Sequence, residues 1–144
     1  MAVTSEQNRA NILRFYEDGW NKGDHSVYEE MVAPDFIDHQ AVPGMAEGRE
    51  GFKMLQVIFK GAFPDLNMIV EDVIAQPDKV ACRWRGLATH QGELFGIPAT
   101  GKSVNVTATV IYKVGPDGKW TEGWINRDDL GMMRQLGVIP TPGQ

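Results

Sequence analysis

The chain has 144 residues, a formal net charge of −5 and an apolar residue content of 42%. Such a length suits one domain with a sizeable core, so we expect a single domain spanning residues 1–144. The acidic balance disfavours nucleic acid and anionic membranes as partners, because both are bound by basic protein faces. The polar start MAVTSEQNRA lacks the apolar core of a signal peptide, and no apolar run reaches the ~20 residues of a membrane span, so we expect a cytoplasmic protein.

The first 64 residues predict three helices. Thr4 and Gln7 have the spacing of a capping box, and apolar residues then recur at helical spacing as far as Gly23. A short helix follows Asp24, and the segment DFIDH after it is expected to be extended. A third helix ends at Pro64. Its apolar side consists of Phe52, Leu55, Ile58, Phe59 and Phe63.

The second half of the chain reads as a sheet. Four strands are expected, at about 66–75, 79–90, 103–114 and 119–128, and the turns QPDK and GPDGK carry the Pro, Asp and Gly that tight turns favour. A last short helix, LGMMRQLG, follows the fourth strand. Helices packed on one face of an antiparallel sheet predict an α+β fold.

The segment GIPATGKS, Gly96 to Ser103, matches the letters of a phosphate-binding P-loop. A P-loop needs a helix after it, so that backbone N–H groups at the helix N-terminus converge on phosphate oxygens. The residues that follow, VNVTATVIYKV, alternate between apolar and polar and predict a strand instead. We therefore expect no nucleotide site, and we interpret residues 92–102 as a long hairpin loop that forms a lip over a pocket.

The fourth strand, WTEGWINRDD, carries the candidate site. Strict alternation puts one set of side chains on a common face, namely Trp120, Glu122, Trp124, Asn126 and Asp128. Tryptophans that share a face with polar groups suggest a concave pocket with apolar walls. The alternative is that Asp128 only caps the terminal helix, and the residues alone leave both interpretations open.

Five segments in this order, WNKGDHSVYEEMVAPDFIDH, PGMAEGREGFK, AFPDL, THQGELFGIPATGK and EGWINRDDLGMMRQLG, resemble the SnoaL-like polyketide cyclase family. The resemblance implies the nuclear-transport-factor-2-like cone, in which a curved sheet and helices enclose a pocket. It also implies catalysis without a cofactor, by intramolecular aldol condensation of an aromatic polyketide. The family's catalytic aspartate corresponds to Asp128, and its neighbouring histidines look like His39 and His90. The chain departs from the family pattern at Ala99, where a second proline is common, and at the charged Arg127.

The chemistry that the resemblance implies is acid/base catalysis on a hydrophobic carbonyl compound. Asp128 would remove a proton next to a carbonyl, with its pKa raised by the apolar wall of Trp124. His90 or Asn126 would donate to the enolate oxygen. A flat ring system would stack between side chains from the sheet and the lip, namely Trp84, Trp124 and Phe95. No metal is expected, because the three histidines of the chain show no ligand spacing.

Two alternatives to a cyclase or isomerase remain open at this point. Epoxide hydrolysis would need an aspartate-activated water and a second acid, drawn from Asp38 or Asp129, but the predicted strands place no arginine between two carboxylates. A non-catalytic module would hold an aromatic or lipid-like molecule in the same pocket. In each case we expect a homodimer, formed in part by the face of the third strand that carries Asn105, Thr107, Thr109 and Ile111.

Overall fold

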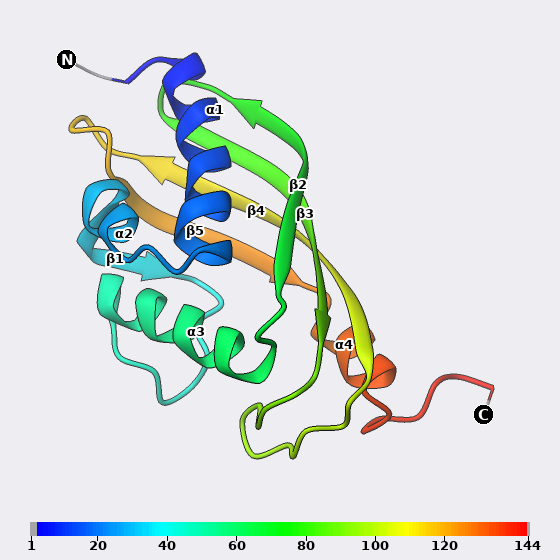
Figure 1. The fold of residues 1–144 in the computed structure, drawn as a ribbon. Helices are drawn as coiled ribbons and strands as arrows, with labels where there is room; N and C mark the ends of the chain where they lie inside the picture. The colour runs from blue at the N-terminus through cyan, green and yellow to red at the C-terminus, as the bar shows by residue number, and fades with distance from the viewer. Residues whose placement is uncertain (1–2, 144) are drawn as a thin grey trace.

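A computed structural model describes residues 3–143 and shows one curved sheet with helices on its concave face (Figure 1). The sheet has five strands in the order β1-β5-β4-β3-β2. β1 runs parallel to β5, and the other neighbouring pairs are antiparallel. The predicted α+β architecture is confirmed. The elements are α1 Ser5–Arg14, η1 Phe15–Asn21, α2 Ser26–Met31, β1 Val32–Asp38, α3 Gly48–Ala62, β2 Asn67–Ala75, β3 Lys79–Thr89, β4 Ser103–Val114, β5 Trp120–Arg127 and α4 Asp129–Gln135.

The N-terminal helix begins as the sequence predicts and then widens. The Thr4 hydroxyl accepts the Gln7 backbone N–H, and the Gln7 side chain accepts the Thr4 N–H, so the capping box is confirmed. From Phe15 the α-helix continues as the π-helical segment η1, which the apolar spacing did not predict. Such segments are uncommon and occur often at functional sites. This one places Tyr16 and Trp20, both buried, against the sheet.

The concave face of β4 forms the centre of the core. Its even-numbered residues are buried and its odd-numbered residues are exposed along the whole strand, as the alternation predicts. β3 pairs with β4 without a register shift from Lys79 to Thr89. Cys82 on β3 is buried, and burial raises the pKa of its thiol to about 12, which disfavours the reactive thiolate.

A β-bulge in β5 changes which side chains face the cavity. Trp120 is opposite Val114, but the next pair along is Glu122 with Lys113, so Thr121 is an extra residue. Beyond it, Ile125 and Arg127 pair with buried positions of β4, whereas Glu122, Trp124 and Asn126 pair with exposed positions. The prediction that Trp120 shares a face with Trp124 and Asn126 is therefore wrong.

Side chains from the helices form hydrogen bonds to the backbone of both edge strands, β2 and β1. At the β2 edge, Asn21 accepts the Met68 N–H and donates to the Met68 carbonyl, with distances of 2.7 and 3.0 Å, and Arg9 donates to the Val73 carbonyl at 3.1 Å. At the opposite edge, Arg49 from α3 donates to the Val32 carbonyl of β1 at 3.1 Å. Backbone groups that an edge strand would leave unpaired are thus bonded to side chains.

The lip over the concave face is tied to the end of α3. The N–H groups of Gln91 and Gly92 both donate to the Ala62 carbonyl. Only glycine fits at position 92, because a Cβ there would lie 2.3 Å from the Gly61 carbonyl oxygen. Ser103, at the end of the P-loop-like letters, begins β4 and not a helix, as predicted.

The absence of a helix after Ser103 yields a simple ligand test. We expect ATP or GTP with magnesium to produce no thermal shift at millimolar concentration, because a strand and not a helix N-terminus follows this loop. Lys102 is exposed, so Lys102→Ala should fold normally, as circular dichroism would show. Saturable nucleotide binding that is lost in Lys102→Ala would contradict the strand assignment.

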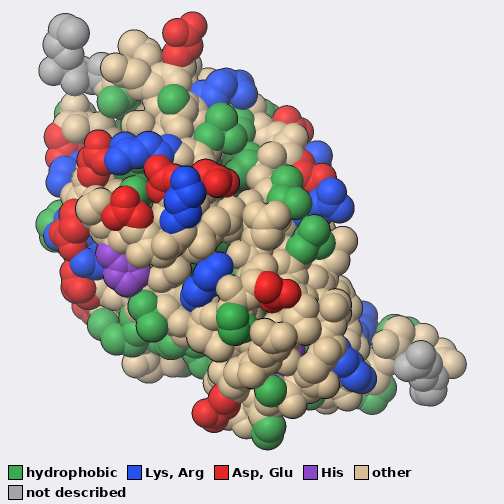
Figure 2. Space-filling model, viewed as in Figure 1, with side chains coloured by type: hydrophobic (Ala, Val, Ile, Leu, Met, Phe, Trp, Pro, Cys, Tyr) green, Lys and Arg blue, Asp and Glu red, His purple; other side chains and the backbone are tan. Residues whose placement is uncertain are grey.

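The surface over the helices mixes acidic and basic side chains. Figure 2 shows red and blue side chains interspersed on this side of the molecule. Among them, Arg14 contacts Asp18 and Glu30, and Glu29 pairs with Arg49. This face therefore offers no continuous basic surface for a polyanion. No helix among residues 3–143 is both long and apolar enough to cross a lipid bilayer.

Candidate functional site

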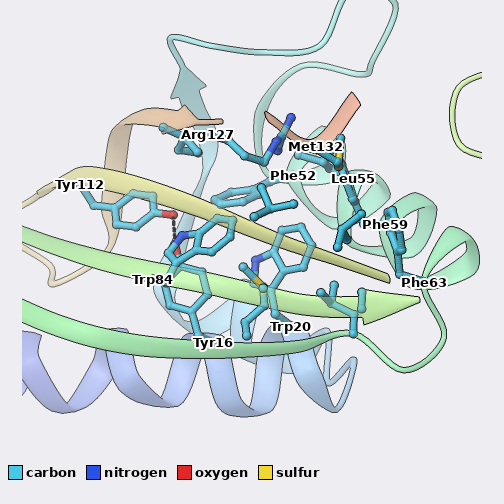
Figure 3. Close-up of a pocket in the computed structure, with 17 residues that line it drawn as sticks. Tyr16, Trp20, Phe52, Leu55, Phe59, Phe63, Trp84, Tyr112, Arg127 and Met132 are labelled. Carbon is cyan, nitrogen blue, oxygen red and sulfur yellow. Dashed lines mark hydrogen bonds between the residues drawn. The ribbon is translucent and has the colours of Figure 1, made fainter. Parts of the chain in front are cut away.

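An aromatic cavity lies between the helices and the concave face of the sheet (Figure 3). It is narrow, with about 50 Å³ open to the centres of water molecules, so the lining side chains must shift before a ring-sized ligand fits. Its walls are almost entirely apolar, and Arg127 is the only charged residue among them. The lining residues are Tyr16, Trp20, Phe52, Leu55, Phe59, Phe63, Leu66, Met68, Trp84, Gly86, Ala88, Val104, Val106, Tyr112, Ile125, Arg127 and Met132.

Arg127 links this cavity to a polar mouth. Its Nε lies 2.5 Å from Oδ1 of Asp129, and its guanidinium carbon lies 4.8 Å from the centre of the Phe59 ring. A second hollow contains Asp38 and Asp129 and shares Leu55, Ile125 and Arg127 with the aromatic cavity. Carboxylates from β1 and from the start of α4 thus flank one guanidinium at the end of an apolar cavity.

Asp38 is the carboxyl group at this mouth with a perturbed pKa. Burial raises the pKa of Asp38 above its usual value, and the charges of Arg127 and His39 and the Gln40 backbone N–H lower it by less. The Gln40 N–H lies 2.9 Å from Oδ1 of Asp38. A carboxyl group that is partly desolvated in a cleft is a candidate acid/base group.

The raised pKa of Asp38 predicts that replacing Asp38 by a neutral residue stabilises the folded protein at neutral pH. Below the pKa of the unfolded chain Asp38 is protonated in both states, and as the pH rises through the folded-state pKa the ionised group destabilises the folded state. We expect Asp38→Asn to raise the melting temperature at pH 7 and not at pH 3, since an amide oxygen still accepts the Gln40 N–H. Asp35→Asn, at an exposed position of the same strand, is the control in thermal unfolding. An equal effect of Asp38→Asn at both pH values would contradict the prediction.

Asp128 lies beside the mouth but is exposed. Its Oδ1 accepts the Gly131 N–H at 2.9 Å, so Asp128 caps α4. This agrees with the second of the two interpretations that the sequence left open. Within residues 3–143 it is not among the residues that line the aromatic cavity, although Arg127 before it and Met132 after it are. The expected burial of Asp128 against Trp124 is wrong, because the bulge turns Trp124 to the other face of the sheet.

Three predicted site residues lie together on the outer face of the sheet. The His39 ring stacks on Trp124 with centroids 4.6 Å apart and an interplanar angle of 9°, and its Nε2 is 2.9 Å from Oε2 of Glu122. Asn126 on the same face is exposed. The predicted placement of Trp124 in the pocket is therefore wrong, because the extra residue in β5 turns it outward, and His39 stacks on it there. Asn126 lines the hollow at the mouth and not the aromatic cavity.

His90 and Phe95 belong to the lip. His90 is fully buried, and its Nδ1 accepts the Thr100 backbone N–H at 3.2 Å, which holds the two ends of the lip together. Phe95 is 48% exposed, and its backbone φ is 45°, a value that residues other than glycine rarely adopt. Neither residue lines the aromatic cavity among the described residues. Phe95 approaches only its outer wall, with its ring 6.0 Å from that of Phe59.

Trp84 is the predicted substrate-contacting residue that the structure places in the cavity. The sequence interpretation missed Tyr16 and Tyr112, whose hydroxyl oxygens lie 2.8 Å apart inside it, and Arg127. The alternation of β4 already pointed Tyr112 inward, but nothing in the sequence pairs it with a helix residue 96 positions away. Within the part of the chain that the structure describes, no group of three or more His, Cys, Asp or Glu side chains is placed to hold a metal ion.

Comparison with known proteins identifies the family. The model of the SnoaL-like polyketide cyclase family matches residues 10–136. The chain belongs to this family. The SnoaL-like match covers every element that forms the cavity, from η1 to α4. No curated protein sequence matches the chain significantly.

Solved structures show the same fold. IdmH from Streptomyces antibioticus, described as a candidate polyketide cyclase, is 33% identical, with a TM-score of 0.78 over 92% of this chain and 99% of its own. A candidate polyketide cyclase from Bacillus cereus is 31% identical, with a TM-score of 0.76 over 90% of this chain and 79% of its own. AclR from Streptomyces galilaeus, described as a candidate hydroxylase, is 27% identical, with a TM-score of 0.80 over 98% and 87%. The expected nuclear-transport-factor-2-like cone is thereby confirmed for a SnoaL-like chain.

Proposed function

We propose that this SnoaL-like protein catalyses cofactor-free acid/base chemistry on a hydrophobic carbonyl compound, by intramolecular aldol cyclisation or a related proton transfer. The observation that carries the proposal is the cavity itself. Its aromatic walls suit a flat apolar molecule, and its mouth holds carboxylates next to one guanidinium. Apolar pockets with a few convergent polar groups are the usual form of small-molecule sites.

The reaction requires a base, a group that binds the enolate oxygen and a proton donor to the accepting carbonyl. Asp128 is the residue that corresponds to the family's catalytic aspartate, and we propose it as the base that removes the proton next to the carbonyl. Burial raises the pKa of Asp38, and we propose this carboxyl group as the proton donor to the accepting carbonyl.

A substrate screen tests this proposal. A panel of polyketide-like esters and 1,3-dicarbonyl compounds is incubated with the protein, and products are identified by mass spectrometry and by exchange of α-protons with D₂O. Turnover or α-proton exchange above the rate in protein-free buffer is expected. Binding of the same compounds without any turnover or exchange would favour a non-catalytic ligand carrier.

Epoxide hydrolysis is a second candidate, because one observation favours it. The sequence placed no arginine between two carboxylates, but in the structure Arg127 contacts Asp129 at 2.5 Å and its charge acts on Asp38. Such an arrangement suits one carboxylate that activates water and a second carboxyl group that protonates the opening ring. Hydrolysis of styrene oxide to the diol by the wild type, lost in Arg127→Gln, would favour this candidate over the cyclase.

We propose a homodimer as the functional assembly. The outer face of the sheet exposes Ile37 and Ile111, which are 53% and 41% accessible, beside the half-buried Trp124. Apolar side chains that cluster on a flat face suit a two-fold contact. Light scattering at micromolar protein should give twice the 16.0 kDa mass of the chain, and Ile111→Glu should shift it to the monomer. A monomeric wild type would contradict this proposal.

A further inference from the structure

The aromatic cavity contains a pair of buried hydroxyl groups that have no role in the proposed catalysis. Tyr16 comes from η1 and Tyr112 from β4, and their side chains are almost fully buried, with 2% and 1% exposed. Their oxygens lie 2.8 Å apart, drawn as the dashed line in Figure 3. Burial raises the pKa of both tyrosines well above the usual value, so both are protonated hydroxyls at neutral pH.

The bond within this pair leaves one hydroxyl hydrogen free to donate. Two hydroxyls carry two hydrogens, and the bond between them uses one. The buried indole N–H of Trp84, beside the pair in Figure 3, acts on Tyr16 as a weak donor but makes no hydrogen bond of good geometry among the described residues. The sulfur of Cys82 is the other polar neighbour, and a thiol is a weak acceptor. Buried donors without acceptors are uncommon and unfavourable, so the site is complementary to an oxygen that accepts hydrogen bonds.

The surroundings restrict the acceptor to a neutral one. The guanidinium of Arg127, the only charge in the cavity wall, is already paired with Asp129. A carboxylate at the hydroxyl pair would be buried without a counter-ion, which is strongly unfavourable. A carbonyl oxygen on a flat apolar ring meets both conditions, since the ring packs against aromatic walls.

We propose that the Tyr16–Tyr112 hydroxyl pair, together with the Trp84 indole N–H, binds the carbonyl oxygen of a neutral, flat ketone or ester. This inference rests on the proposed function, because it takes the aromatic cavity as the ligand site. It adds which group of the ligand faces the two tyrosines. In a proton transfer next to that carbonyl, the same donors would stabilise the enolate oxygen.

The test uses 1-tetralone and its hydrocarbon analogue tetralin, with binding followed by tryptophan fluorescence. The quantity of interest is the ratio of the two affinities, which isolates the carbonyl contribution. Tyr16→Phe or Tyr112→Phe alone leaves one hydroxyl free to donate, so the decisive variant carries both changes. We expect the double variant to lower the ratio by about 2–10-fold, the usual effect of one hydrogen bond, and to leave tetralin affinity unchanged.

Tyr28→Phe is the matched control, because Tyr28 is a buried tyrosine whose hydroxyl donates to the Gly19 carbonyl outside the cavity. It should leave the ratio at the wild-type value. Infrared spectroscopy is the second measurement: the carbonyl stretch of bound 1-tetralone should lie at lower frequency in the wild type than in the double variant. An unchanged ratio and stretch in a folded double variant, or no binding of 1-tetralone by the wild type, would overturn the proposal. This binding test does not depend on turnover. Carbonyl selectivity here, together with no activity in the substrate screen, would support this subsite and contradict only the catalytic proposal.

Discussion

Asp128→Asn is expected to lower turnover by ~10²–10⁴-fold on any substrate found in the screen, the usual contribution of a general base. An amide cannot accept the proton, so the chemical step is lost while ligand binding in the cavity remains. The fold should be retained, because asparagine caps a helix about as well as aspartate and its oxygen still accepts the Gly131 N–H. Steady-state kinetics and thermal unfolding of the same preparations would check both parts.

Two neighbouring carboxylates serve as comparisons in this experiment. Asp129→Asn keeps a polar group next to Arg127 and should change turnover much less, because Asp129 is already paired. Asp38→Asn should weaken the alkaline limb of the pH profile if Asp38 donates the proton to the accepting carbonyl, because a proton donor stops working when it ionises. If Asp129→Asn or Asp38→Asn abolishes turnover while Asp128→Asn retains it, the residue carried over from the family is the wrong one.

Trp120→Ala is expected to destabilise the fold by about 3–5 kcal/mol, the range for truncation of a large buried aromatic side chain. Trp120 is fully buried, and its ring stacks on Tyr112 with centroids 4.1 Å apart and lies 4.7 Å from Phe15. Chemical denaturation followed by circular dichroism measures the change. Trp120→Phe should cost much less, because it keeps the stacking and removes an indole N–H that has no partner among the described residues.

Trp124→Ala is the partner experiment, and it tests the bulge directly. Trp124 is four residues further along β5 and would share the face of Trp120 if the strand were regular. In the structure it lies on the outer face against His39, so its loss should destabilise the monomer far less than that of Trp120. Similar losses for the two tryptophans, measured under conditions where the protein is monomeric, would contradict the register of β5.

The contrast between β4 and β5 shows what the sequence could reveal about the fold. In β4, apolar and polar residues alternate without interruption, and every face assignment made from that pattern is confirmed. In β5 the same argument fails after one extra residue, Thr121, because a single insertion turns all later side chains to the opposite face. Nothing in the letters Trp-Thr-Glu distinguishes a bulged strand from a regular one.

The candidate site was harder to predict than the fold, because it depends on contacts between distant segments. Tyr16 lies in the stretch of apolar residues that predicts the first helix, but its hydroxyl is bonded to one from β4, which that pattern does not reveal. Arg127 looked like a departure from the family pattern until Asp38, 89 positions earlier, was seen to lie at the same mouth. Trp84 was placed correctly because β3 has an uninterrupted register with β4.

The edges of the sheet bear on how the protein behaves at high concentration. Sheets with bare edges can recruit strands from other molecules and template aggregates. Here Asn21 and Arg9 bind the backbone of β2, Arg49 binds that of β1, and β2 is further bent by an irregularity between Val70 and Asp72. Strand-by-strand growth into fibrils is thereby discouraged, and two of the side chains that discourage it, Asn21 and Arg49, come from helices that also enclose the cavity.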